Sequence, residues 1–92
     1  MNVVTLQIGN SDDKLTQNLW HHFVGETSTA INTLALRVHF FGGPNNWEPW
    51  QNAAWVFEIG DNAPALKRRL QEIREAYRQD SVAWTEGETL FV

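Results

Sequence analysis

The sequence predicts an α+β domain with the ferredoxin-like βαββαβ fold, in which two helices cover one face of a four-stranded antiparallel sheet. Two observations support this prediction. Two segments repeat apolar residues with the period of a helix, and four segments alternate apolar and polar residues as strands do. Their order along the chain is strand, helix, strand, strand, helix, strand. Ninety-two residues can bury one core, so we expect residues 1–92 to form a single domain.

The first strand is predicted over residues 3–8, and the first helix follows it. Ser11 is a favourable N-cap, and the acidic residues 12–13 would then lie in the first turn, where the helix dipole favours negative charge. The apolar stripe of this helix is expected to include Leu15, Leu19 and Phe23, with Trp20 beside them. Gly25 and the polar run 27–29 weaken the helix, but the apolar phase continues to Leu34.

The second strand is predicted over residues 34–40 and the third over residues 55–59. In the second strand, one face is expected to pack under the helices and to consist of Leu36, Val38 and Phe40. Arg37 and His39 would then line the opposite, open face of the sheet.

The second helix has the clearest periodicity of the chain. Asp61 or Asn62 is expected to cap it, and Pro64 is tolerated in its first turn. Its apolar stripe is predicted to consist of Leu66, Leu70, Ile73 and Tyr77. The last strand is expected over residues 81–86, after a turn in which Asp80 and Ser81 form hydrogen bonds.

The segment 42–55, between the second and third strands, holds three of the five Trp residues of the chain. Trp47 and Trp50 lie outside any alternating pattern and could stack on a planar ring, while the amides of Asn46 and Gln51 could read its edge. The alternative is that both indoles fold back to hold the loop, or lie in a dimer interface. Trp55 is expected to belong to the core.

Composition and charge exclude several classes of protein. No segment approaches the run of about 18 apolar residues that a membrane span requires, and the first residues lack the basic region of a signal peptide. The absence of Cys excludes disulfides and thiolate chemistry. A net charge of −4 argues against a general nucleic-acid binder. We therefore expect a cytoplasmic protein that binds neither membranes nor nucleic acid.

The charge is distributed unevenly, because five of the seven Lys and Arg residues lie within residues 67–78. A basic helix on an acidic body can orient an anion or an acidic partner, although such a face is also commonly only solvated. His22 and Glu26 have a spacing that can share a metal on a helix, but no further ligands are evident, so we expect no metal and no cofactor.

Three strings of the sequence are IGNSDDKLTQ (8–17), PWQNA (49–53) and YRQDSVAW (77–84). They resemble landmarks of a family of small stand-alone bacterial and phage proteins that is uncharacterised, so the resemblance implies no activity and no site residues. In general character, a compact acidic domain with an aromatic loop is also similar to small viral proteins that sequester nucleotide signals or block host defence proteins. That analogy at the level of fold establishes no function.

The sequence therefore leads to a hypothesis of a non-enzymatic, homodimeric binding protein. It would hold a small nucleotide-like ligand against the Trp47/Trp50 loop and the open sheet face, and Arg37 or the basic helix would meet a phosphate. One alternative is a protein-interaction inhibitor or adaptor that binds a host protein through Trp47 and Trp50. A second is a small dimeric enzyme with His39 or His22 as its base.

Overall fold

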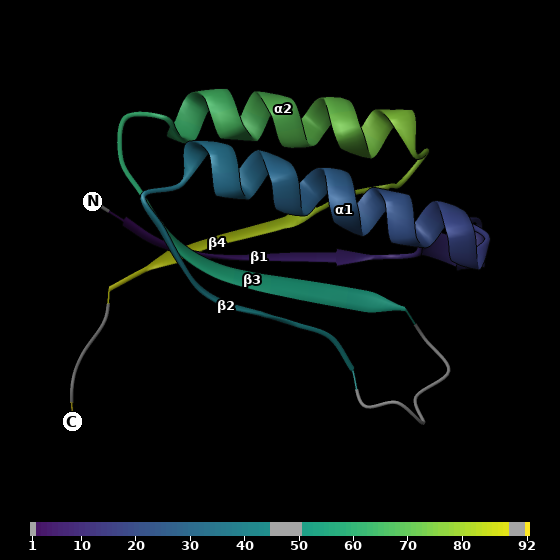
Figure 1. The fold of residues 1–92 in the computed structure, drawn as a ribbon, viewed down its shortest axis with the longest axis horizontal. Coiled ribbons are helices and arrows are strands. Elements are labelled where there is room, and N and C mark those ends of the chain that lie inside the picture. Colours follow the sequence, from purple (N-terminus) through teal and green to yellow (C-terminus); the bar gives the residue numbers. More distant parts are fainter. Residues whose placement is uncertain (1, 45–50, 89–91) are drawn as a thin grey trace.

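The computed structural model describes residues 2–44, 51–88 and 92, and within them the strands and helices follow the predicted order (Figure 1). The strands are β1 (Asn2–Gly9), β2 (Arg37–Gly42), β3 (Asn52–Ile59) and β4 (Ala83–Gly87). The helices are α1 (Gln17–Leu34) and α2 (Ala63–Ala76), and a short 3-10 helix, η1 (Ser11–Asp13), precedes α1.

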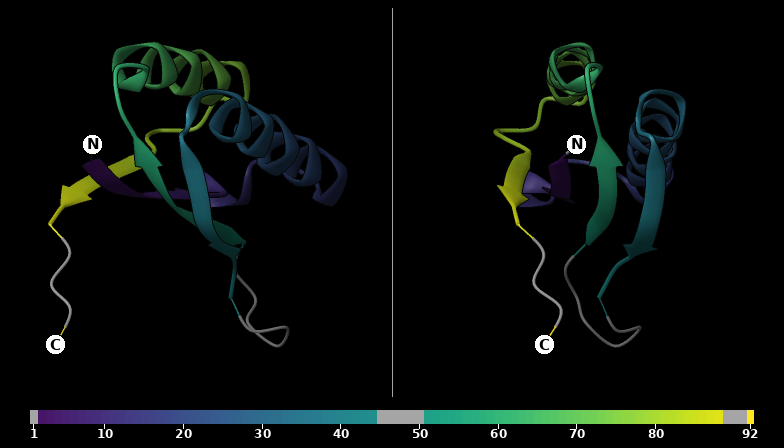
Figure 2. Two further views of the ribbon diagram at one scale, coloured as in Figure 1. Left: turned by 60° about the vertical axis from the view of Figure 1, so that its left-hand side comes forward. Right: turned by 90° about the vertical axis from the view of Figure 1, so that its left-hand side faces the viewer.

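The four strands form one antiparallel sheet in the order β2-β3-β1-β4. β1 and β3 are central, and β2 and β4 are the two edges. Both helices lie on the same face of the sheet, while no other element of the described ranges covers the opposite face (Figure 2). This order, with two helices on one face, is the predicted ferredoxin-like fold.

The core lies between the helices and the two central strands. The alternation predicted for β1 and β3 is confirmed, because every second residue of each strand is buried under the helices. These residues include Val4, Leu6 and Ile8 of β1 and Trp55, Phe57 and Ile59 of β3. From α2, the core receives Leu66, Leu70 and Ile73. Of the helices in the described ranges, neither is both long and apolar enough to cross a membrane.

α1 begins later than the sequence predicts. Its N-cap is Thr16, whose Oγ1 accepts a hydrogen bond from the Leu19 amide at 3.2 Å. The predicted N-cap at Ser11 was wrong because Asp12 and Asp13 both have a φ of 54°. That left-handed conformation cannot continue into an α-helix, so the chain forms a separate short turn before α1.

The buried face of α1 also differs from the prediction. Leu19 is 45% exposed, whereas the other residues of the predicted apolar phase, Trp20, Phe23 and Ile31, pack against the core. Successive helical residues are rotated by about 100°, so a stripe that includes Trp20 turns Leu19 towards solvent. Gly25 does not interrupt the helix, which continues to Leu34 as the apolar phase predicts.

The turn between α2 and β4 is held by Gln79, which is 2% exposed. Its Oε1 accepts a hydrogen bond from the Ser11 amide at 2.7 Å, and its Nε2 donates one to the Tyr77 carbonyl at 3.1 Å. Of the two residues predicted to bond this turn, Asp80 accepts a hydrogen bond from Lys14 Nζ at 3.4 Å, while the buried contacts come from Gln79. The buried amide connects the end of α2 to the turn that follows β1.

Candidate functional site

The edge strand β2 contains a β-bulge at His39. Val38 opposes Phe57 and Phe40 opposes Val56, so His39 is an extra residue with no partner in β3. An extra residue shifts the alternation of every residue after it. Phe40 consequently lies with Val56 on the open face, and the prediction that it packs under the helices was wrong because strict alternation counts the bulged residue.

Charged and polar side chains share this part of the open face. Arg37 pairs in register with Glu58, which points away from the helices because Phe57 and Ile59 on either side of it are buried. His39 Nε2 lies 3.5 Å from Glu58 Oε1. The structure thus places Arg37 and His39 on the open face, as the alternation predicted, and adds the Glu58 carboxylate beside His39.

Phe40 gives this face an exposed aromatic ring. Its side chain is 53% exposed and lies against the backbone of Gly42. A Cβ added at Gly42 would lie only 2.7 Å from the Phe40 Cζ, so the ring can take this position because residue 42 is glycine. An exposed ring with a guanidinium on the same strand is a combination that binds planar anions.

Two further exposed apolar side chains belong to β2 or lie directly before it. Phe41 points to the helix side of the sheet, where its ring centroid lies 5.0 Å from that of Trp55, yet it is 53% exposed because β2 is an edge strand. Leu36, immediately before β2, is 62% exposed. We call Leu36, Phe40 and Phe41 the β2 apolar edge. They are three of the five large exposed apolar residues in the described ranges.

Gln51, predicted to contact a ligand, is held by other amides. Its Oε1 accepts a hydrogen bond from Asn10 Nδ2 at 2.6 Å, and its Nε2 donates one to Gln17 Oε1 at 2.7 Å. Asn10 also bonds both backbone groups of Leu15, at 2.9 and 3.0 Å. The Gln51 side chain therefore anchors the start of β3 to the beginning of α1. The other predicted contacts of this segment lie outside the described residues: Asn46, Trp47 and Trp50.

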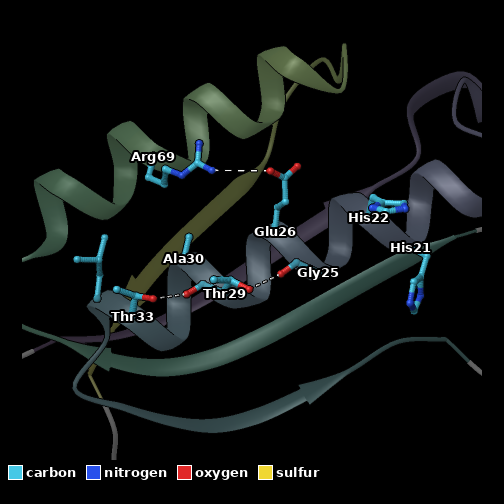
Figure 3. Close-up of a pocket in the computed structure, with 9 residues that line it drawn as sticks. His21, His22, Gly25, Glu26, Thr29, Ala30, Thr33 and Arg69 are labelled. Atoms are coloured by element: carbon cyan, nitrogen blue, oxygen red, sulfur yellow. Dashed lines mark hydrogen bonds and ion pairs between the residues drawn. The ribbon is translucent and has the colours of Figure 1, made fainter.

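A groove of about 620 Å³ runs along the outer side of α1 beside α2 (Figure 3). Its walls include His22 and Glu26 of α1 and Arg69 of α2, and Arg69 Nη2 lies 3.8 Å from Glu26 Oε1. The hydroxyl groups of Thr29 and Thr33 donate to carbonyls of their own helix at 3.0 and 2.7 Å. Within the described ranges, no three His, Asp or Glu side chains come together as a metal site.

Glu26 also influences Tyr77 at the end of α2. The Tyr77 ring stacks on Phe23, with centroids 5.1 Å apart. Burial, together with a hydrogen bond to Glu26 and the negative charge of that carboxylate, raises the pKa of Tyr77 to about 12. A tyrosine is protonated at neutral pH even at its ordinary pKa of about 10, so this shift changes its protonation only in strongly alkaline solution.

The basic residues of α2 mostly have partners within the protein. Lys67 Nζ lies 3.7 Å from Glu86 Oε1 and 5.0 Å from the centroid of the Trp84 ring. Arg74 Nη2 lies 3.4 Å from Glu75 Oε1. These contacts favour the interpretation of the basic helix as a surface paired with nearby acids, and they leave Arg37 as the better-placed cation for the open face.

Sequence reasoning missed Phe40 and Glu58 as members of the candidate site. The signal for Phe40 was the adjacent pair Phe40-Phe41, because two consecutive aromatic residues cannot both satisfy a period of two. The signal for Glu58 was the strand pattern itself, in which Glu58 stands between the core residues Phe57 and Ile59.

No protein-family model matches the chain, and neither a curated protein nor a solved structure matches it.

Proposed function

We propose that this protein is a non-enzymatic binding protein that recognises a small, nucleotide-like ligand on the open sheet face at β2 and β3. The observation that carries the proposal is the exposed Phe40 ring on the same face as Arg37 and His39. The segment that contains Asn46, Trp47 and Trp50 joins these two strands in the chain, so its side chains belong to the same proposal.

The ligand class follows from the chemistry of these side chains. A base stacked on an aromatic ring contributes roughly 1–3 kcal/mol and requires no particular sequence. A guanidinium binds phosphate through paired N–H donors. The His39–Glu58 pair, 3.5 Å apart, offers polar atoms to a base or a sugar. A planar ring that carries a negative group satisfies all three features together.

The same His39–Glu58 pair is the feature that an enzyme with a histidine base would use, because a carboxylate can orient an imidazole. We favour binding over catalysis because His39 is 41% exposed to solvent, whereas a catalytic base acts in a site that excludes water. In this proposal the pair serves recognition.

The test is a calorimetric titration of the full chain with mononucleotides and with a cyclic dinucleotide. Phe40→Ala and Arg37→Gln should each weaken binding at least tenfold and leave the melting temperature almost unchanged, because both side chains are exposed. Leu19→Ala and Arg68→Gln are the matched controls, since they remove an exposed apolar residue and an exposed arginine from the helical layer. Absence of binding at millimolar nucleotide, or equal weakening in the controls, would remove the nucleotide proposal.

The indoles are tested separately. Trp47→Ala and Trp50→Ala should abolish binding with little loss of stability, while Trp55→Ala should cost about 3–5 kcal/mol because Trp55 is 1% exposed. Thermal melts of the three variants measure the difference. If Trp47→Ala and Trp50→Ala melt as low as Trp55→Ala, the indoles form a local core and do not serve as ligand contacts.

A second candidate function is a protein-interaction inhibitor or adaptor, which the β2 apolar edge favours. Exposed aromatic and apolar side chains grouped on one edge are typical of interaction hot spots. A role in phage or bacterial defence or counter-defence belongs to this candidate. Its test is a host protein that co-purifies with the wild type, is lost with Phe41→Asp, and binds again when both proteins are purified. If no such protein reconstitutes, the nucleotide candidate stands alone.

A further inference from the structure

We propose that a second copy of this chain adds to the free side of β2, antiparallel and around a two-fold axis between His39 and Phe40. The two sheets then become one continuous sheet with their open faces on the same side. Each copy places its Arg37 beside the partner's Phe40. The pairing itself goes beyond the proposed function, and only the role of the partner's Arg37 at a ligand rests on that function.

The free side of β2 is the surface at which a strand can be added. In the described ranges β2 pairs with β3 on one side only. Its aromatic rings lie on both faces, with Phe40 on the open face and Phe41 on the helix side. An added strand would therefore contact an apolar ring above and below the sheet. Strand addition of this kind combines main-chain hydrogen bonds with side-chain contacts.

The proposed axis fixes the register in which the two β2 strands pair. An axis between His39 and Phe40 places Val38 opposite the partner's Phe41, an apolar pair. It places His39 opposite the partner's Phe40, so that an imidazole meets a phenyl ring. Arg37 then lies opposite the partner's Gly42. No two like charges oppose each other in this register, and like charges in directly opposite positions are what destabilises a strand pair.

Gly42 has no side chain and is covered by the Phe40 ring of its own chain. A residue directly opposite Gly42 therefore meets that ring instead of a Cβ. When the residue is the partner's Arg37, the contact joins a guanidinium and an aromatic ring, which attract each other. Two-fold symmetry produces this contact twice.

The charge of this surface favours a second copy over a different protein. The chain has a net charge of −4, so two copies repel unless their contact surface is locally balanced. Beside the β2 apolar edge, Arg37 and Glu58 supply one positive and one negative charge on the same face. A balanced apolar surface complements itself, whereas a strongly acidic or basic partner would require charge of one sign. The bulge at His39 shortens the regular pairing, because bulges limit edge-to-edge contact, and the dimer should therefore dissociate on dilution.

The main experiment is sedimentation of the full chain over a dilution series without any ligand. The wild type should approach twice 10.6 kDa at high concentration. Phe41→Asp and Arg37→Glu should sediment as monomers while their circular dichroism spectra stay native. Leu19→Asp, an exposed apolar position on α1, should dimerise as the wild type does. A folded wild type that remains a monomer at all concentrations overturns the proposal.

Cross-linking locates the axis. Because the chain has no Cys, His39→Cys introduces a single thiol next to the proposed axis, and mild oxidation should give a covalent dimer. Arg68→Cys on α2 is the control and should not cross-link. A dimer that forms without cross-linking at residue 39 overturns the β2 pairing. A monomer that binds nucleotide removes only the dimer, and a dimer that binds none removes only the nucleotide function.

Discussion

At the scale of single residues, Tyr77 reports most directly on its own burial and on its contact with Glu26, because its titration is not mixed with that of any other tyrosine. Its pKa is raised to about 12, first by burial and then by Glu26. The folded state therefore holds this proton more tightly than the unfolded state, whose tyrosine has a pKa of about 10. The resulting stabilisation is fully present below about pH 10 and is lost as the pH rises through about 12.

Titration of the tyrosinate absorbance should therefore give a midpoint near pH 12. Glu26→Gln should lower the midpoint, because it removes the negative charge, but should leave it above that of a free tyrosine, because burial remains. Glu72→Gln, on the exposed side of α2, is the control and should not move it. A wild-type midpoint near pH 10 would show that Tyr77 is neither buried nor bonded to Glu26 as described.

At the scale of elements, periodicity predicted the type and order of each helix and strand, but it did not predict every phase. β1, β3 and α2 keep a regular period, so their buried residues were predicted from the sequence. The stripe of α1 was assigned partly wrongly at Leu19, because the helix turns Trp20 and Phe23 to the core, and Leu19, about 100° from Trp20, to solvent. In β2, Arg37 precedes the bulge and was placed correctly, whereas Phe40 follows it and was not.

A matched pair of leucines tests the packing of the helices. Leu70→Ala should cost about 2–5 kcal/mol, because Leu70 is almost completely buried and its removal leaves a cavity. Leu19→Ala should change the free energy of unfolding by about 0.5 kcal/mol or less, because its side chain is largely in solvent. Urea unfolding of both variants gives the two values. Equal destabilisation would mean that the buried face of α1 has been assigned wrongly here.

At the scale of the whole molecule, buried and half-buried amides join segments that are distant in the sequence. Asn10 and Gln51 join the end of β1 to the start of β3, and Gln79 joins the end of α2 to Ser11. Sequence patterns report the period of a segment and cannot report such partners, which explains why the bonds of Gln79 and Gln51 were missed. Gln51 as a ligand contact stays a prediction. Of the candidate site, alternation placed Arg37 and His39, while Asn46, Trp47 and Trp50 stay predictions.

Removal of the Gln79 amide tests this connection. Gln79→Leu should cost about 1–3 kcal/mol, because the half-buried Ser11 amide loses its acceptor. Ser81→Ala, an exposed neighbour, should change the free energy of unfolding by about 0.5 kcal/mol or less. Thermal melts compare them. If the two variants have the same melting temperature, the bond between Gln79 and Ser11 contributes little to holding the end of α2 against the turn that follows β1.

The bulge at His39 has a consequence for changes in chain length. Loss of one residue from a strand normally turns every later side chain to the wrong face. Without His39, however, Arg37, Val38, Phe40 and Phe41 would alternate regularly against the same partners in β3. A chain that lacks His39 should therefore fold with Phe41 still beside Trp55, as measured by a native circular dichroism spectrum and native indole fluorescence. Deletion of Val56 from β3, which has no such extra residue, should prevent folding. Position 39 is thus the point in β2 where evolution or design can shorten the chain without losing the register of the sheet.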